Sequence, residues 1–224
     1  MTDIFPYLVV YFDRGDDMQN LTFVTGNYGK YCSVKERFEK EGIEIKYFDC
    51  DLKEASINDI SVISRGKAVD AYEKVQGPVF VADTGFYIED YPNKPLYPGA
   101  FVKRSGISSD INHLLEVMKD RENRACYFLD CLTYYDGEDC VQFYGSSRGV
   151  LAKEVHGSAK KNAKSNLWFV FIPDLGCGKT LAEMSDEELW TMRSLEESAT
   201  SKFISWYKDK VMGAKVKTKI EKKS

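Results

Sequence analysis

The segment Leu21–Lys30, which reads L-T-F-V-T-G-N-Y-G-K, constrains the fold more than any other part of the chain. Its apolar start is typical of a β-strand, Gly26 and Asn27 favour a turn, and the residues that follow are compatible with a helix. A helix that starts directly after a strand presents backbone N–H groups and the positive end of its dipole at the turn. Thr25 and Asn27 add polar side chains there, and Lys30 adds a positive charge. The segment therefore predicts a phosphate-binding turn, although a purely structural turn between strand and helix has the same pattern.

A second strand-like segment lies at Val75–Gly85, V-Q-G-P-V-F-V-A-D-T-G. It predicts a short buried strand over Val79–Val81 that places Asp83 at its carboxyl end, with Thr84 and Gly85 in the turn that follows. Ligands bind outside the carboxyl ends of strands in open α/β sheets. A carboxylate there suits Mg²⁺, which prefers oxygen ligands and often shares them with phosphates. The alternative is that Asp83 only caps the next segment.

Composition excludes several classes of protein. The 224 residues are 43% hydrophobic, which excludes global disorder, and the net charge of −4 predicts no nucleic-acid partner. The six cysteines include no C-x-x-C pair and only two histidines are present, so we expect no zinc site. Neither a leader nor a membrane span is visible, so the sequence predicts no membrane partner and a cytoplasmic protein with reduced thiols.

One motif is a false lead. Gly176–Thr180, G-C-G-K-T, resembles the end of a P-loop, but the complete pattern needs a glycine where Pro173 stands. We therefore expect no P-loop ATPase or GTPase.

The remaining pattern predicts an α/β protein with three parts. Residues 1–20 form an N-terminal extension in which Leu8–Phe12 could add an edge strand, residues 21–212 form the domain, and residues 213–224 form a lysine-rich flexible tail. Tyr87–Ala100 is rich in turn formers and predicts a loop. Strands are predicted over Ala125–Tyr135 and Val141–Val150, joined by a turn at Asp136-Gly137. Helices are predicted over Ile111–Lys119 and Ser198–Met212. A further helix is predicted to run through Arg193, with Ser185 as its N-cap and Glu188 at the capping-box position.

The two opening segments and three further ones occur in an order that resembles the inosine triphosphate pyrophosphatase family. The further matches are D-L-K-E (Asp51–Glu54), Y-P-G-A-F-V-K (Tyr97–Lys103) and L-A-E-M-S-D-E-E (Leu181–Glu188), and Gly66-Lys67 precedes the second segment. This resemblance covers most of Leu21–Tyr207. It implies an elongated mixed-sheet α/β fold, of the kind called anticodon-binding-like or Maf-like, with two lobes around a central cleft.

The resemblance also implies roles for individual residues. Thr25, Gly26, Asn27 and Lys30 match the positions that hold the triphosphate, and Lys67 matches a second lysine on the phosphate side. Glu54 and Asp83 match acidic residues at the metal and water site, so the resemblance makes Asp83, Glu54 and Lys30 the catalytic candidates. Thr84 and Gly85 complete the turn after Asp83, and Lys103 belongs to a segment that matches the one lining the cleft, so the resemblance makes all three candidates for substrate binding.

The family hydrolyses non-canonical purine nucleoside triphosphates, such as ITP, dITP and XTP, to the monophosphate and pyrophosphate. The resemblance thus implies a nucleoside triphosphate substrate, Mg²⁺ with Mn²⁺ as a substitute, and a homodimer. Fixed positive charge at Lys30 and Lys67 would stabilise the polyphosphate, and Glu54 or Asp83 could take a proton from the attacking water.

The chain departs from the family at several positions. Ser33 and Ala82 stand where the family has acidic residues, and Leu189 stands where it has a lysine that is important for the base. The Ser-His-Arg that grips the base is replaced by Arg193-Ser194-Leu195. Trp168 and Arg193 could build a different base pocket by stacking and guanidinium contacts, or Trp168 could simply fill the core.

These departures leave three functional readings. The first is a divergent, Mg²⁺-dependent pyrophosphohydrolase with altered base specificity. The second is a degenerate member that binds nucleotide, or a protein partner, with little or no turnover. The third is a purely structural protein, for which nucleotide would not change stability. Function inferred from a fold is analogy, so these readings need the site itself to decide among them.

Overall fold

The computed structural model describes residues 21–158 and 165–221. Seven strands and five α-helices follow one another along this part of the chain, with one 3₁₀ helix, η2. Their bounds are β1 (Thr22–Val24), α1 (Tyr28–Lys40), β2 (Lys46–Phe48), α2 (Ile60–Val75), β3 (Val79–Ile88), β4 (Tyr97–Gly99), α3 (Ile111–Val117), β5 (Ala125–Tyr135), β6 (Cys140–Leu151), η2 (Asn166–Phe169), β7 (Phe171–Pro173), α4 (Asp186–Leu195) and α5 (Ala199–Glu221).

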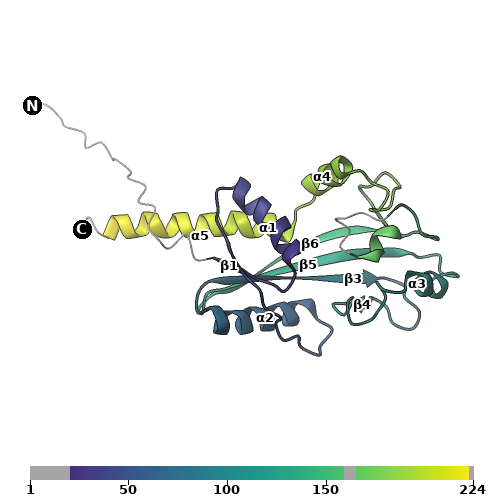
Figure 1. Cartoon of the computed structure of the whole chain (residues 1–224), viewed down its shortest axis with the longest axis horizontal. Helices are drawn as coiled ribbons and strands as arrows, with labels where there is room; N and C mark the ends of the chain where they lie inside the picture. The colour runs from purple at the N-terminus through teal and green to yellow at the C-terminus, as the bar shows by residue number, and fades with distance from the viewer. Residues whose placement is uncertain (1–20, 159–164, 222–224) are drawn as a thin grey trace, which may run out of the picture.

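All seven strands form one mixed sheet in an elongated molecule (Figure 1). The order is β2-β1-β3-β5-β6-β7, and β4 pairs with the far end of β3. Strands β2, β1 and β3 are parallel, whereas β3, β5, β6 and β7 are antiparallel. Helices α1 and α5 lie on one face at one end of the sheet, and α2 lies on the other (Figure 1). The predicted mixed-sheet α/β fold is therefore confirmed.

Apolar side chains gather in three cores, which explains the two lobes. One core joins α1 and α5 to the sheet and contains Phe38, Phe80 and Phe203. A smaller one lies under α2 on the opposite face. The third fills the other end of the molecule, where α3, η2, β7 and α4 pack on the sheet around Phe86 and Phe171. The long strands β3, β5 and β6 run through both ends and hold the lobes together (Figure 1).

The predicted end of the strand at Val81 is wrong. Strand β3 continues to Ile88, and each residue from Val79 to Ile88 is paired with one residue of β5. Asp83 and Thr84 are therefore inside a strand rather than at its end, because long-range pairing outweighs the local turn preference of D-T-G. The loop predicted over Tyr87–Ala100 is wrong at both ends, since Tyr87 and Ile88 belong to β3 and residues 97–99 form β4.

Other local predictions are confirmed. The hairpin β5–β6 turns at Asp136-Gly137, where Gly137 has a φ of +99° that favours glycine. Ser185 caps α4 and Glu188 completes the capping box. The predicted end of the last helix at Met212 is wrong, since α5 runs to Glu221. The predicted edge strand at Leu8–Phe12 lies outside the described residues.

Within the described residues, no helix is both long and apolar enough to cross a membrane. Residues 176–178 lie in a turn and residues 179 and 180 in irregular chain, and the next helix begins only at Asp186, so the helix that a P-loop requires does not follow this motif.

Candidate active site

An opening in the sheet lies along one edge of β3. Strand β1 pairs with β3 only as far as Phe80, and β4 pairs with the same edge of β3 from Phe86 onward, while β5 occupies the opposite edge. Among the described residues no strand covers Val81–Gly85 on this side. Side chains from α1, from α2 and from the loops after β2 and β4 reach the middle of the molecule at this opening.

The turn after β1 is built by its own side chains. Thr25 Oγ1 accepts a hydrogen bond from Asn27 N at 3.1 Å, and Asn27 Oδ1 caps α1 by accepting one from Lys30 N at 2.9 Å. Gly26 is needed because a Cβ there would lie 2.7 Å from Asp51 Oδ1. Asn27 thus takes the N–H of Lys30, and the positive end of the α1 dipole still favours an anion at this position.

Lys30 reaches from α1 to the open edge of β3. Its Nζ donates a hydrogen bond to the backbone oxygen of Ala82 at 2.5 Å. Burial lowers the pKa of Lys30, and the nearby Lys67 lowers it further, while Asp83 and Asp130 oppose the shift. Lys30 is therefore a partly buried cation at this edge, and a charge-assisted hydrogen bond from such an ammonium is a strong contact for a phosphate oxygen.

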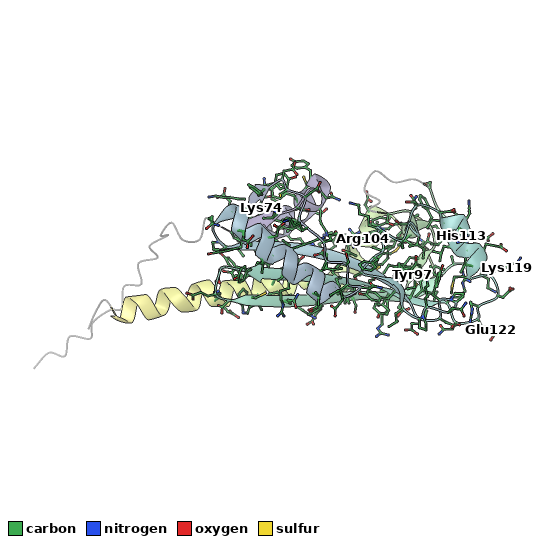
Figure 2. The ribbon with its side chains drawn as sticks, turned by 90° about the horizontal axis from the view of Figure 1, so that it is seen from below. Lys74, Tyr97, Arg104, His113, Lys119 and Glu122 are labelled. Carbon is green, nitrogen blue, oxygen red and sulfur yellow. The ribbon has the colours of Figure 1, made fainter. Side chains whose placement is uncertain are left out.

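Lys67 is the centre of a second group, on the α2 face. Its Nζ lies 2.5 Å from Asp83 Oδ1 and 2.7 Å from Glu54 Oε1, and the Arg104 guanidinium lies 3.0 Å from Glu54 Oε2. The side chains of Lys67 and Asp83 are 14% and 13% exposed, so this ion pair is largely removed from water. Figure 2 places Arg104 in the middle of the molecule, between α2 and the end that carries α3.

Charges in this group shift one another's pKa values. Burial alone would lower the pKa of Lys67, but Asp83 and Glu54 raise it above its usual value. Burial alone would raise the pKa of Glu54, but Lys67 and Arg104 lower it overall. Lys67 is therefore held as a cation and Glu54 as a carboxylate at neutral pH.

Asp83 provides the test of whether these residues fit a metal ion. Its Oδ2 is buried and has no hydrogen-bond partner among the described residues, although Oδ1 receives Lys67. A buried charged oxygen without a partner is unfavourable, and a metal ion or water would satisfy it. Within the described chain no three His, Cys, Asp or Glu residues converge on one point. The residues thus fit a divalent cation held by one or two carboxylates and completed by phosphate oxygens.

On the opposite face, the structure adds a carboxylate that sequence reasoning missed. Asp130 lies opposite Thr84 in the β3–β5 ladder, and Thr84 Oγ1 donates a hydrogen bond to Asp130 Oδ1 at 2.5 Å. Only the pairing of two strands, 46 residues apart in sequence, brings them together. Arg104 was also missed, because its contact with Glu54, 50 residues away in sequence, depends on how the chain turns after β4.

The candidates for the base side, Trp168 and Arg193, lie in and next to the core around Phe86 and Phe171. Trp168 is buried, 4% exposed, and the guanidinium carbon of Arg193 lies 5.5 Å from the centre of its ring. Burial lowers the pKa of Arg193, and Arg37 lowers it further. Trp168 thus fills the core and supports Arg193 at the boundary of that core.

Lys103 and Gly85 have different surroundings. Lys103 is exposed, and within the described residues no hydrogen bond or ion pair joins its side chain to the other candidates. A Cβ at Gly85 would lie 2.7 Å from the Tyr87 ring and 3.1 Å from Gly99 O, so glycine allows β4 and Tyr87 to close over the strand.

The fold and the site together define a two-lobed α/β protein with a lysine and carboxylate cluster at an opening in its sheet. The family model described as "Ham1 family" matches residues 21–206, and the chain therefore belongs to the Ham1 family. This finding confirms the resemblance seen in the sequence.

Named relatives cover most of the chain. "Inosine triphosphate pyrophosphatase 2" of Trypanosoma cruzi is 32% identical over 176 residues, which are 78% of this chain and 86% of that protein. "dITP/XTP pyrophosphatase" of Methanopyrus kandleri is 30% identical over 192 residues, 85% of this chain and 97% of that protein. A solved HAM1 protein from Coxiella burnetii has a TM-score of 0.71 at 18% identity, covering 86% of this chain and 100% of that one.

Proposed function

We propose that the protein hydrolyses non-canonical purine nucleoside triphosphates, of the ITP, dITP and XTP type, to the monophosphate and pyrophosphate. The observation that supports this best is the buried Oδ2 of Asp83, which has no hydrogen-bond partner in the described part of the chain, while Oδ1 of the same carboxylate is paired with Lys67. Names of the relatives, inosine triphosphate pyrophosphatase and dITP/XTP pyrophosphatase, support the substrate class.

The chain's own residues would divide the work in this reaction. The start of α1 and Lys30 would hold phosphate oxygens at the open edge of β3, and Lys67 would neutralise charge on the α2 side. Fixed cations stabilise the transition state because they need no reorganisation when charge moves within the polyphosphate. Asp83, assisted by Glu54, would accept the proton of the attacking water.

Asp83 and Glu54 would also hold the metal, Mg²⁺ or Mn²⁺. When bound, such an ion would neutralise phosphate oxygens and make its water more acidic. Glu54 uses one lone pair of each oxygen for Lys67 and Arg104, and a carboxylate oxygen has a further lone pair to offer.

We also propose that base specificity differs from that of the relatives. Leu189, 1% exposed, takes the place of the lysine that the resemblance predicts for the base, and Arg193 rests on Trp168. A pocket that lacks one hydrogen-bonding group distinguishes bases differently from one that has it. For the whole protein we propose a cytoplasmic location and a homodimeric state. Sedimentation velocity would test the homodimer.

The direct test is pyrophosphate release from ITP, XTP, dITP, dUTP and the standard nucleotides, with Mg²⁺ and with EDTA. Metal-dependent release that is lost in Asp83→Asn would support the proposal. Full activity of a folded Asp83→Asn protein would refute the role of Asp83.

A second function is favoured by the departures at Ser33 and Ala82, which leave fewer carboxylates than the resemblance predicts. It is a nucleotide-binding protein with little turnover. Thermal stabilisation by ITP without pyrophosphate release, in protein that is shown to be folded, would support this alternative.

A further inference from the structure

Glu54 lies on an irregular loop, although the proposed metal site needs its carboxylate at a fixed place. Residues 49–59, between β2 and α2, form neither helix nor strand, and Glu54 itself is exposed. Lys67 contacts one oxygen of the carboxylate, but this contact reaches the end of the side chain and not the backbone that carries it. Loops with few contacts open at a low cost in free energy, so further groups are needed to hold Glu54 in place.

Arg104 provides a contact with the backbone of this loop. Its Nη1 donates to Ala55 O and its Nη2 to Glu54 O, both at 3.2 Å, and Nη2 also lies 3.0 Å from Glu54 Oε2. One planar guanidinium therefore contacts the Glu54 side chain and two consecutive carbonyl groups of the loop. A lysine ammonium would not reproduce this arrangement, because it is a point charge on a flexible stem and not a rigid fork of donors.

Asn58 joins the same loop to the chain around β4 at a second point. Its Nδ2 donates to Pro98 O at 3.1 Å, and its Oδ1 accepts from Ala100 N at 2.8 Å. A Cβ at Gly99 would lie 2.7 Å from Asn58 Oδ1, so glycine allows this close approach. Both ends of the Asn58 amide are thus used to fix the loop to the backbone of residues 98–100.

The segment that holds the loop is itself anchored in the other lobe. Strand β4 pairs with the far end of β3, and Tyr97 and Val102 pack against the core at the end that carries α3. Leu52, on the loop before Glu54, packs against the small core under α2. The two points of contact therefore connect one lobe to the other beside the proposed site, and Figure 2 shows Arg104 between α2 and the α3 end.

We infer that Arg104 and Asn58 are positioning residues for the metal ion, which hold the loop so that the Glu54 carboxylate can ligate the ion together with Asp83. This inference rests on the proposed function of the site. Groups that orient a metal ligand typically contribute 10-fold or more to metal affinity. An effect of charge has the opposite sign, because a cation beside the site repels a metal ion. Asn58 is uncharged, so its replacement tests the geometry alone.

The first measurement is Mn²⁺ binding to the nucleotide-free protein, followed by the loss of the electron paramagnetic resonance signal of the free ion. Arg104→Ala and Arg104→Lys should each raise the Kd for Mn²⁺ about 10-fold, and Asn58→Ala should raise it about threefold or more. In pyrophosphate release from ITP, the half-saturating Mg²⁺ concentration should rise by similar factors. The kcat at saturating Mg²⁺ should stay within about threefold, because the ligands are misplaced but still present.

Arg121→Ala is the matched control. Arg121 lies 3.4 Å from Asp90 and its side chain is 38% exposed, compared with 40% for Arg104, but its pair lies after α3, away from the site. Its Kd for Mn²⁺ should equal the wild-type value. The Tm of every variant is measured as well, since a purely structural role of Arg104 would lower Tm and leave the Kd of the folded protein unchanged.

Several results would overturn the inference. Tighter Mn²⁺ binding by Arg104→Ala would show that Arg104 acts only through its charge. An unchanged Kd in Arg104→Lys or in Asn58→Ala would show that the geometry of these contacts is not needed. A higher KM for ITP with an unchanged Kd for Mn²⁺ would assign Arg104 to the phosphate, and a wild-type protein that binds no Mn²⁺ would have no ion to position.

Failure of the proposed function has a separate signature. If the wild-type protein binds Mn²⁺ but releases no pyrophosphate from any nucleotide, the hydrolase proposal fails. Weaker Mn²⁺ binding by the Arg104 and Asn58 variants would still support their positioning role in that case. Conversely, wild-type hydrolysis with the same metal dependence in all variants would support the hydrolase and refute the positioning role.

Discussion

Lys67→Met would test whether the cluster at Asp83 is held together by one buried cation. Lys67 contacts Asp83 and Glu54 at 2.5 and 2.7 Å, and its methionine replacement fills similar space without charge. Among residues 21–158 and 165–221, the Asp83 carboxylate would then have no hydrogen-bond partner at either oxygen. Removing one member of a buried ion pair costs about 3–5 kcal/mol. Because Glu54 is 35% exposed and can turn to water, we expect the lower value, about 3 kcal/mol.

The assay is urea unfolding followed by tryptophan fluorescence, with the midpoint and slope fitted together. A loss of about 3 kcal/mol corresponds to roughly 6–12 °C in Tm for a domain of this size. Adding Asp83→Asn to Lys67→Met should recover at least half of the loss, because the stranded group is then uncharged. A double-mutant cycle isolates this coupling.

Lys74→Met is the matched control on the same helix. Lys74 pairs with Asp70 at 2.5 Å, but its side chain is 35% exposed, and exposed pairs within a helix contribute little. Its unfolding midpoint should stay close to the wild-type value. If Lys67→Met is no more destabilising than this control, or if Asp83→Asn recovers nothing, the ion pair does not hold the site.

Three further predictions follow from single contacts. Gly26→Ala should raise KM for the nucleotide more than it lowers Tm, because the new Cβ would displace the Asp51 carboxylate from the turn that starts α1; an unchanged KM in steady-state assays would contradict this. Arg124→Met should destabilise the protein by about 3 kcal/mol in urea unfolding, since the buried guanidinium donates to three backbone carbonyls that would lose their partner; a loss below about 1 kcal/mol would be too small for this role. Burial alone would raise the pKa of Asp136, but Lys210 and neighbouring N–H groups lower it to about 2. The stability that Asp136 contributes is therefore complete above its unfolded pKa of about 3.9 and is lost as pH falls toward 2, so Asp136→Asn should flatten the acid limb of a stability–pH curve between about pH 5 and 2.

Much of the phosphate side could be predicted from the chain alone. The strand, turn and helix at Leu21–Lys30 are encoded by adjacent residues, and so is the capping role of Asn27. The matches at Glu54, Lys67 and Asp83 named residues that the structure brings together, since Lys67 Nζ lies within 2.7 Å of an oxygen of each carboxylate. The sequence analysis expected the Asn27 side chain to contact phosphate, whereas in the structure its oxygen accepts a hydrogen bond from Lys30 N at the start of α1.

Other parts of the site could not be predicted, and the reason is pairing between distant strands. D-T-G after Val81 reads locally as a turn, yet ten consecutive pairs with β5 hold it extended. The same pairing places Asp130 next to Thr84, and no periodicity within either segment indicates that contact. Arg104, rather than Lys103, meets Glu54 because of how the chain turns after β4.

The sequence by itself determined the elements whose cause is local. These are the βα turn at Gly26, the capping box at Ser185 and the hairpin turn at Gly137, since backbone sterics and hydrogen bonds act over a few residues. Only the tertiary structure decided that β3 continues through both lobes, and that Asp83 and Asp130 lie on opposite faces of the sheet. Alternate residues of a strand point to opposite faces, so the register of β3 and β5 decides on which face of the sheet each carboxylate lies.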